Sequence, residues 1–203
     1  MTATDTAAAA DAKPAASAPP ALGRAPAIAL AAAVAATFGL SLALGPVLGP
    51  WAFLVAAMPV ALWVAWSDMA RMKIPNRAVL ALVAVFAVLG PLVLGPEAWA
   101  WRWLHLATVL AIGFVLNMAG AFGAGDAKFA AAMAPFVGLP DAAAFCYLLA
   151  AVTIAAFAVH RTVRAIGPLR RLAPGWESWH RTDFPMGLAL AGALVIHLAL
   201  KAL

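Results

Sequence analysis

The sequence predicts an all-α polytopic membrane protein with about seven transmembrane helices. Of its 203 residues, 66% are apolar and only 10% are charged, whereas soluble domains are about 25% charged. The apolar residues stand in long runs without the period-two alternation of a membrane β-barrel. The basic residues lie in short loops between these runs, so the net charge of +5 reflects orientation in the lipid bilayer and no nucleic-acid partner is expected.

The chain is predicted to consist of a tail and one membrane domain. Residues 1–25 are rich in Ala, Pro and Ser and are expected to be disordered, and residues 26–203 form the transmembrane domain. A cleaved signal peptide with its apolar region at 26–44 is the competing interpretation. The long polar lead and the length of the apolar run favour a retained first span.

The spans follow from the apolar runs, because a helix needs roughly 20 apolar residues to cross a bilayer. Such runs lie at 26–44, 48–67, 78–95, 99–121, 142–160 and 184–202. Segment 127–140 is apolar but short and contains Pro135. It forms either a short span or a re-entrant helix, and we favour the short span. The prediction is therefore six to seven crossings.

The basic residues orient these spans. With seven crossings, eleven of the thirteen fall on one side: Lys13, Arg24, Arg71, Lys73, Arg77, Lys128, Arg161, Arg164, Arg170, Arg171 and Arg181. Arg102 and Lys201 fall on the other side. Because Lys and Arg concentrate in cytoplasmic loops, the N-terminus is predicted to be cytoplasmic and the C-terminus external. The arginine-rich segment 161–182 is attributed mainly to this topology, with contact to anionic lipid as a weaker alternative.

Two aspartates are the candidate site residues. Asp68 ends the run at 48–67 and Asp126 precedes the segment 127–140, so both are predicted at the cytoplasmic face although 58 residues separate them. A carboxylate beside a bilayer is costly unless it is paired, protonated or faces water, which makes each a functional candidate. Two carboxyl groups close together are expected to share one proton and act as an acid–base pair.

The residues around each aspartate suggest local structure. Pro75 is expected to separate two helices, with Asn76 as the N-cap of the second. Gly123 and Gly125 remove side chains just before Asp126, so another backbone can approach closely. The plainer interpretation is that these glycines join two helices and that Asp126 caps the second.

These motifs resemble those of the type IV prepilin peptidases, which are membrane aspartic proteases of the GxGD type. The resemblance rests on Asp68 with Ile74-Pro75-Asn76, on Gly123-Ala124-Gly125-Asp126 with Lys128, and on Pro185-Met186-Gly187 before the last span. It covers roughly 50–203. Arg71 and Ala121 depart from the family's pattern, in the spacing of an arginine and in the loss of a glycine.

The resemblance implies an aspartic endopeptidase of the bacterial inner membrane, with Asp68 and Asp126 as the catalytic pair facing the cytoplasm. It would cleave the leader from prepilin or pseudopilin precursors, just before a hydrophobic helix of the precursor, without a metal or other cofactor. Long members of the family methylate the new N-terminus and carry two CxxC pairs. Because Cys146 is the single cysteine, the chain resembles the short form that serves tight-adherence (Flp-type) pili, and methylation is not expected.

Two alternatives remain open at this stage. The aspartates of a non-enzymatic membrane subunit or small transporter would serve as ion or proton ligands, although few polar residues lie in the middle of the runs. A presenilin-like intramembrane protease shares the Gly-x-Gly-Asp sequence, but Ser67 stands where that group carries Tyr. His105, His160, His180 and His197 are scattered and do not form a metal-ligand spacing. The substrate and the oligomeric state are left open.

Overall fold

The computed structural model describes residues 32, 36 and 49–203. The tail predicted at 1–25 and nearly all of the first predicted span, 26–44, lie outside these residues. Every regular element among the described residues is helical, as predicted. The elements are α2 (Pro50–Arg71), α3 (Asn76–Leu94), α4 (Pro96–Met118), α5 (Ala124–Met133), η1 (Ala134–Phe136), η2 (Leu139–Asp141), α6 (Ala142–Ala165), α7 (Gly167–Arg170), η3 (Glu177–Trp179) and α8 (Met186–Ala202).

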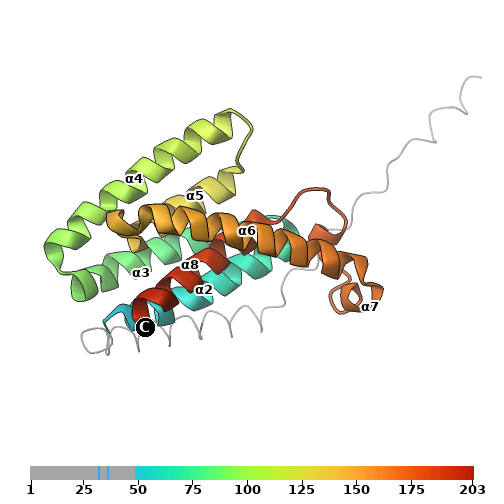
Figure 1. Cartoon of the computed structure of the whole chain (residues 1–203), viewed down its shortest axis with the longest axis horizontal. Helices are drawn as coiled ribbons and strands as arrows, with labels where there is room; N and C mark the ends of the chain where they lie inside the picture. The colour runs from blue at the N-terminus through green and yellow to red at the C-terminus, as the bar shows by residue number, and fades with distance from the viewer. Residues whose placement is uncertain (1–31, 33–35, 37–48) are drawn as a thin grey trace, which may run out of the picture.

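Four of these helices are long and apolar enough to cross a membrane: α2, α3, α4 and the segment Leu139–Ala165 that contains α6. Helix α8 is apolar too but has 17 residues. Successive long helices run in opposite directions, and α5 turns the chain back so that α4 and α6 point the same way (Figure 1). The ends of α2, α4 and α6 therefore lie at one end of the bundle, together with the starts of α3, α5 and α8.

Helix α2 forms the centre of the bundle and packs against α3 and α8 (Figure 1). Its core residues include many alanines, such as Ala52, Ala57 and Ala61, which lets neighbouring helices approach closely. Larger side chains fill the core at the opposite end from the start of α8. Phe136 of η1 lies edge-on to Phe53 of α2 and Phe86 of α3, with ring centroids 5.2 and 5.4 Å away.

The segment predicted as a short span, 127–140, does not form one continuous helix. Helix α5 ends at Met133, where the chain tightens into the 3₁₀ helix η1 around Pro135. Ten α-helical residues rise about 15 Å, half of the roughly 30 Å of a bilayer core. Pro135 explains the break, because it has no N–H to donate to the preceding turn.

The two basic residues at the far end have structural partners there. Arg102 Nη1 donates to the carbonyl oxygen of Pro135 at 3.0 Å, and His105 Nδ1 donates to that of Val137 at 3.0 Å. Lys201 Nζ contacts Asp141 Oδ1 at 2.7 Å. A broken helix at membrane depth leaves carbonyl groups that must find donors. Arg102 and His105 supply those donors, so the break is held in place from α4.

Candidate active site

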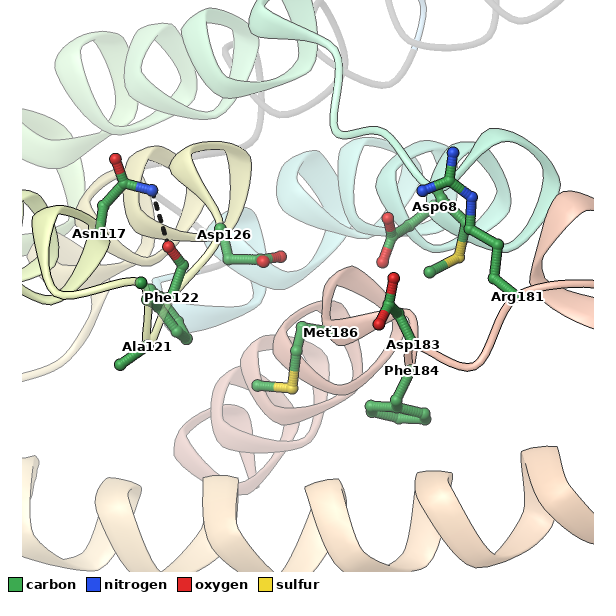
Figure 2. Close-up of a pocket in the computed structure, with 12 residues that line it drawn as sticks. Asp68, Asn117, Ala121, Phe122, Asp126, Arg181, Asp183, Phe184 and Met186 are labelled. Carbon is green, nitrogen blue, oxygen red and sulfur yellow. Dashed lines mark hydrogen bonds between the residues drawn. The ribbon is translucent and has the colours of Figure 1, made fainter.

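A polar pocket of about 590 Å³ lies at the end of the bundle where α2 and α4 end and α5 and α8 begin. It is lined by residues from these four helices and from the loops beside them: Asp68, Met72, Asn117, Gly120, Ala121, Phe122, Gly123, Asp126, Arg181, Asp183, Phe184 and Met186. The two aspartates that the sequence singled out therefore share one pocket. Figure 2 shows their carboxyl groups reaching into it from different helices.

Asp68 lies in the last turn of α2 and is only 6% exposed. Its Oδ2 accepts a hydrogen bond of 2.7 Å from the backbone N–H of Gly187 in the first turn of α8. That amide is one of the four that a helix leaves without a partner at its N-terminus. A Cβ atom at Gly187 would lie 2.9 Å from Oδ2 and 3.0 Å from the Cβ of Asp68. Gly187 is thus the residue that lets α8 approach this carboxylate.

Ser67 fixes the backbone beside Asp68. Its buried hydroxyl donates to the carbonyl oxygen of Lys73 at 2.7 Å and accepts from Arg71 Nη2 at 2.9 Å. Met72 ends the helix in the left-handed conformation, with φ of 51°. These contacts hold a tight loop between α2 and α3 and keep Asp68 at the pocket wall.

The capping role predicted for Asn76 is wrong. Pro75 is the N-cap of α3, and Asn76 is the first residue of the helix and makes no capping hydrogen bond. Asn76 Oδ1 instead accepts a long hydrogen bond of 3.4 Å from Lys128 Nζ of α5. Pro75 can take the N-cap position because an extended backbone suits a proline. The Ile-Pro-Asn loop is therefore connected to the start of α5.

Asp126 is the third residue of α5, whose N-cap is Gly123, so Asp126 is not the cap itself. Its carboxylate accepts a hydrogen bond from the backbone of Gly123, as an acidic residue does at this position of a capping box. A Cβ atom at Gly123 would collide with Asp126 Oδ2, whereas one at Gly125 would make an ordinary contact of 3.4 Å with Ile74. Gly123 is therefore the glycine on which the position of the Asp126 carboxylate depends.

The turn between α4 and α5 is held from α4. Asn117 Nδ2 donates to the carbonyl oxygen of Phe122 at 2.7 Å, a contact visible in Figure 2. Gly120 adopts φ of 72°, a conformation that a side chain disfavours. Together these residues place Gly123 and Asp126 at the rim of the pocket.

Burial and a neighbouring charge both act on Asp126. Desolvation, and then the negative charge of Asp68, raise the pKa of the Asp126 carboxyl group from 3.8 to about 6, against the opposing effect of the Gly123 hydrogen bond. This electrostatic coupling means that protonation of one aspartate depends on the state of the other.

The loop before α8 brings in residues that the sequence did not single out. Asp183 is exposed and points into the pocket near Asp68 (Figure 2). The loop is held by α6: Arg161 Nη2 donates to the carbonyl oxygen of Thr182 and Arg164 Nη1 to that of Arg181, both at 2.6 Å. These two arginines were attributed mainly to topology, because no pattern in the sequence indicates a bond to a backbone carbonyl.

Aromatic stacking supports the same loop. The Trp179 ring is nearly parallel to the buried ring of His160 at 5.2 Å and to that of Trp176 at 5.4 Å. Trp176 in turn lies edge-on to Trp66 of α2 at 5.3 Å. The loop is thus clamped between α6 and α2, and its residues at the pocket have fixed neighbours on both sides.

Comparison with known families identifies the family of the chain. The profile of the type IV leader peptidase family matches residues 55–159, which is more than half of the chain. The chain belongs to the type IV leader peptidase family. No curated protein and no solved structure matches the chain.

Membership of the type IV leader peptidase family indicates a membrane protease that acts on leader peptides. The matched region contains both Asp68 and Asp126, which line one pocket. Asp183, which lines the pocket, and Gly187, which donates to Asp68, lie beyond the matched region. The Pro-Met-Gly sequence before the last span was a signal for Gly187, but nothing in the sequence showed that its amide would bind Asp68.

Proposed function

We propose that this leader peptidase is an aspartic endopeptidase that removes the leader from prepilin-like precursors at the cytoplasmic face of the inner membrane, with Asp68 and Asp126 as its catalytic pair. The observation that carries the proposal is the shared pocket, in which two carboxyl groups from separate helices are electrostatically coupled. The concentration of basic residues at this end of the bundle supports the cytoplasmic orientation.

In the proposed mechanism the two carboxyl groups share one proton. The ionised carboxylate takes a proton from water while the water oxygen bonds to the scissile carbonyl carbon. The protonated carboxyl group gives its hydrogen to the carbonyl oxygen, where negative charge develops. When the tetrahedral intermediate collapses, the C–N bond breaks and the leaving amine takes a proton from the pair. The reaction yields a free leader and a new N-terminus.

Leader removal in cells tests the pair. Asp68→Asn and Asp126→Asn, each expressed with a prepilin-like precursor, are expected to leave the precursor uncut. Asp183→Asn is the matched control, because it removes a carboxylate of the same pocket that we place outside the pair. Normal leader removal by Asp68→Asn or Asp126→Asn, at normal protein levels, would refute the catalytic pair. It would favour the alternative in which the aspartates of a membrane subunit or transporter serve as ion or proton ligands.

We further propose that the product is not methylated, because the chain has a single cysteine, Cys146, rather than the CxxC pairs of methylating members. The mass of the processed precursor's N-terminal peptide measures this directly. An unmodified amine is expected, and an added mass of one methyl group would contradict the proposal. The same spectrum identifies the cleaved bond.

A further inference from the structure

A second hollow, almost entirely apolar and about 410 Å³ in volume, lies between α4 and α6. Its floor is made by α5, η1 and α8. Val109 of α4, Met133 of α5, and Phe145 and Cys146 of α6 are among its lining residues. The catalytic proposal gives this hollow no role.

Two helices, α5 and α8, line both the hollow and the carboxylate pocket. Ala130 lines the hollow one turn after Asp126 on α5, and Leu190 lines it one turn after Met186 on α8. Residues four apart in a helix lie on the same face. Polar walls around the aspartates therefore give way to apolar walls within one turn, in the direction of the bilayer interior.

The two helices beside the hollow are largely uncovered. Among the 23 residues of α4 only Gly113 is buried, and among the 24 of α6 only His160. Helix α5 lies between them but ends after ten residues (Figure 1). The hollow is lined where α5 stops and the chain turns into α6, which leaves an apolar channel flanked by two exposed apolar faces.

We propose that this hollow, with the facing sides of α4 and α6, is the docking groove for the apolar helix that follows the scissile bond in the precursor. The inference rests on the proposed function, since a leader peptidase must hold a bond between a polar segment and an apolar helix. The polar pocket then binds the leader and the groove binds the helix. The pocket and the groove follow one another along α5 and α8 in the same order as the leader and the helix in the precursor. The roughly 15 Å length of α5 corresponds to about three turns of a bound helix.

Cys146 makes the groove accessible to a direct test, because it is the single cysteine of the chain and is exposed in the groove. The full chain carrying Asp68→Asn, which keeps the precursor uncut, is oxidised in membranes with precursors that carry one cysteine at successive positions of the apolar helix. Disulfides to Cys146 are expected on one face of that helix, every three to four positions.

The control moves the cysteine to the other side of α6. In the double variant Cys146→Ala, Ala144→Cys, the thiol lies at almost the same depth but about 160° around the helix, at an exposed position outside the groove. Cross-linking at least tenfold weaker and without periodicity is expected. Equal cross-linking at the two positions would overturn the groove and would indicate that lipid fills it.

A bulky side chain in the groove tests docking of the helix separately from hydrolysis of the peptide bond. Thr108→Trp places a large ring at an exposed groove position of α4, and Leu110→Trp places one on an exposed face of α4 that does not line the groove. Thr108→Trp is expected to slow cleavage of the full precursor at least tenfold, mainly through KM. It is expected to leave unchanged the cleavage of a soluble leader peptide that ends soon after the scissile bond.

The results distinguish the two proposals. Cleavage of both substrates at normal rates by Thr108→Trp, with no preferred disulfide to Cys146, would refute the groove while the peptidase stands. Failure of the unmodified chain to cleave either substrate would refute the peptidase, and the groove with it.

Discussion

Gly123, the N-cap of α5, and Gly125, the second residue of that helix, stand two residues apart but tolerate a side chain differently. A Cβ atom at Gly123 would collide with Asp126 Oδ2, whereas at Gly125 it would make only an ordinary contact with Ile74. Gly123→Ala is therefore expected to displace the carboxylate and lower kcat about 10²-fold, since small misplacements of a catalytic group cost that much. Gly125→Ala is the matched control and should retain most activity. Equal losses of activity in both variants would show that glycine is required for the approach of the substrate to the backbone, and not for the position of the carboxylate.

The raised pKa of Asp126 makes a prediction about stability. Between pH 3.8 and about 6 the folded protein binds more protons at this residue than the unfolded chain does. Its stability therefore falls as the pH rises through this range. Asp126→Asn removes the effect, so it should raise the Tm in detergent by roughly 2–4 °C at pH 8. The gain should disappear below pH 3.8, and a gain that is constant with pH would contradict the assignment.

The same residue sets a limit on activity. Above a pH of about 6 Asp126 loses its proton beside an ionised Asp68, and a pair with both carboxyl groups ionised contains no acid. The rate of leader cleavage by the purified protein should therefore decline as the pH rises through about 6. Asp183→Asn should leave the position of this decline unchanged, because Asp183 is not among the groups that shift the pKa of Asp126.

At the scale of elements, the arginines at the end of α6 do more than orient the chain. Arg161 and Arg164 hold the carbonyl groups of the loop that carries Asp183 and leads into Gly187. The double variant Arg161→Gln, Arg164→Gln is expected to lower cleavage about tenfold through this loop, with normal membrane insertion. Arg170→Gln with Arg171→Gln removes the same charge from exposed positions whose hydrogen bonds, among the described residues, are made by the backbone and not by the side chain. Equal effects of both pairs on cleavage would leave topology as the whole explanation.

The sequence predicted the long helices well because their signal is local. The runs at 48–67, 78–95 and 99–121 correspond to α2, α3 and α4 with ends that differ by one to four residues. The structure of segment 127–140 was harder to predict, because its composition is that of a span. Pro135 breaks the helix, and Arg102 and His105 supply hydrogen-bond donors to the break from another helix. A contact of that kind cannot be recognised from the sequence around the position that it stabilises.

In the candidate site, too, the local features could be predicted from the sequence and the contacts between distant residues could not. Asp68 and Asp126 could be found because an acid beside an apolar run is unusual, and their common end follows from the alternation of spans. The amide of Gly187, 119 residues from Asp68 along the chain, could not be paired with it from the sequence. Asn76 was assigned a capping role because local rules favour it, yet Pro75 occupies the cap and Asn76 contacts Lys128 of α5.

At the scale of the whole molecule, the two ends of the bundle differ in charge and should face different compartments. Glu97, which follows the turn between α3 and α4, and Arg171, which follows α7, are exposed at opposite ends. In a Cys146→Ala chain, Glu97→Cys is expected to react with an impermeant maleimide in cells whose outer membrane has been opened. Arg171→Cys should react only after the inner membrane is broken. The reverse pattern would place the pocket outside the cytoplasm.

The most direct test of the central claim is the rate of leader hydrolysis by purified Asp68→Asn, Asp126→Asn and the double variant, measured in single turnover. If the two carboxyl groups act as one unit, each single variant loses at least about 10³-fold and the double variant loses little more, because residues that act together are not additive. A single variant that retains substantial hydrolysis, or a double variant whose loss is the product of two modest single losses, would contradict the account.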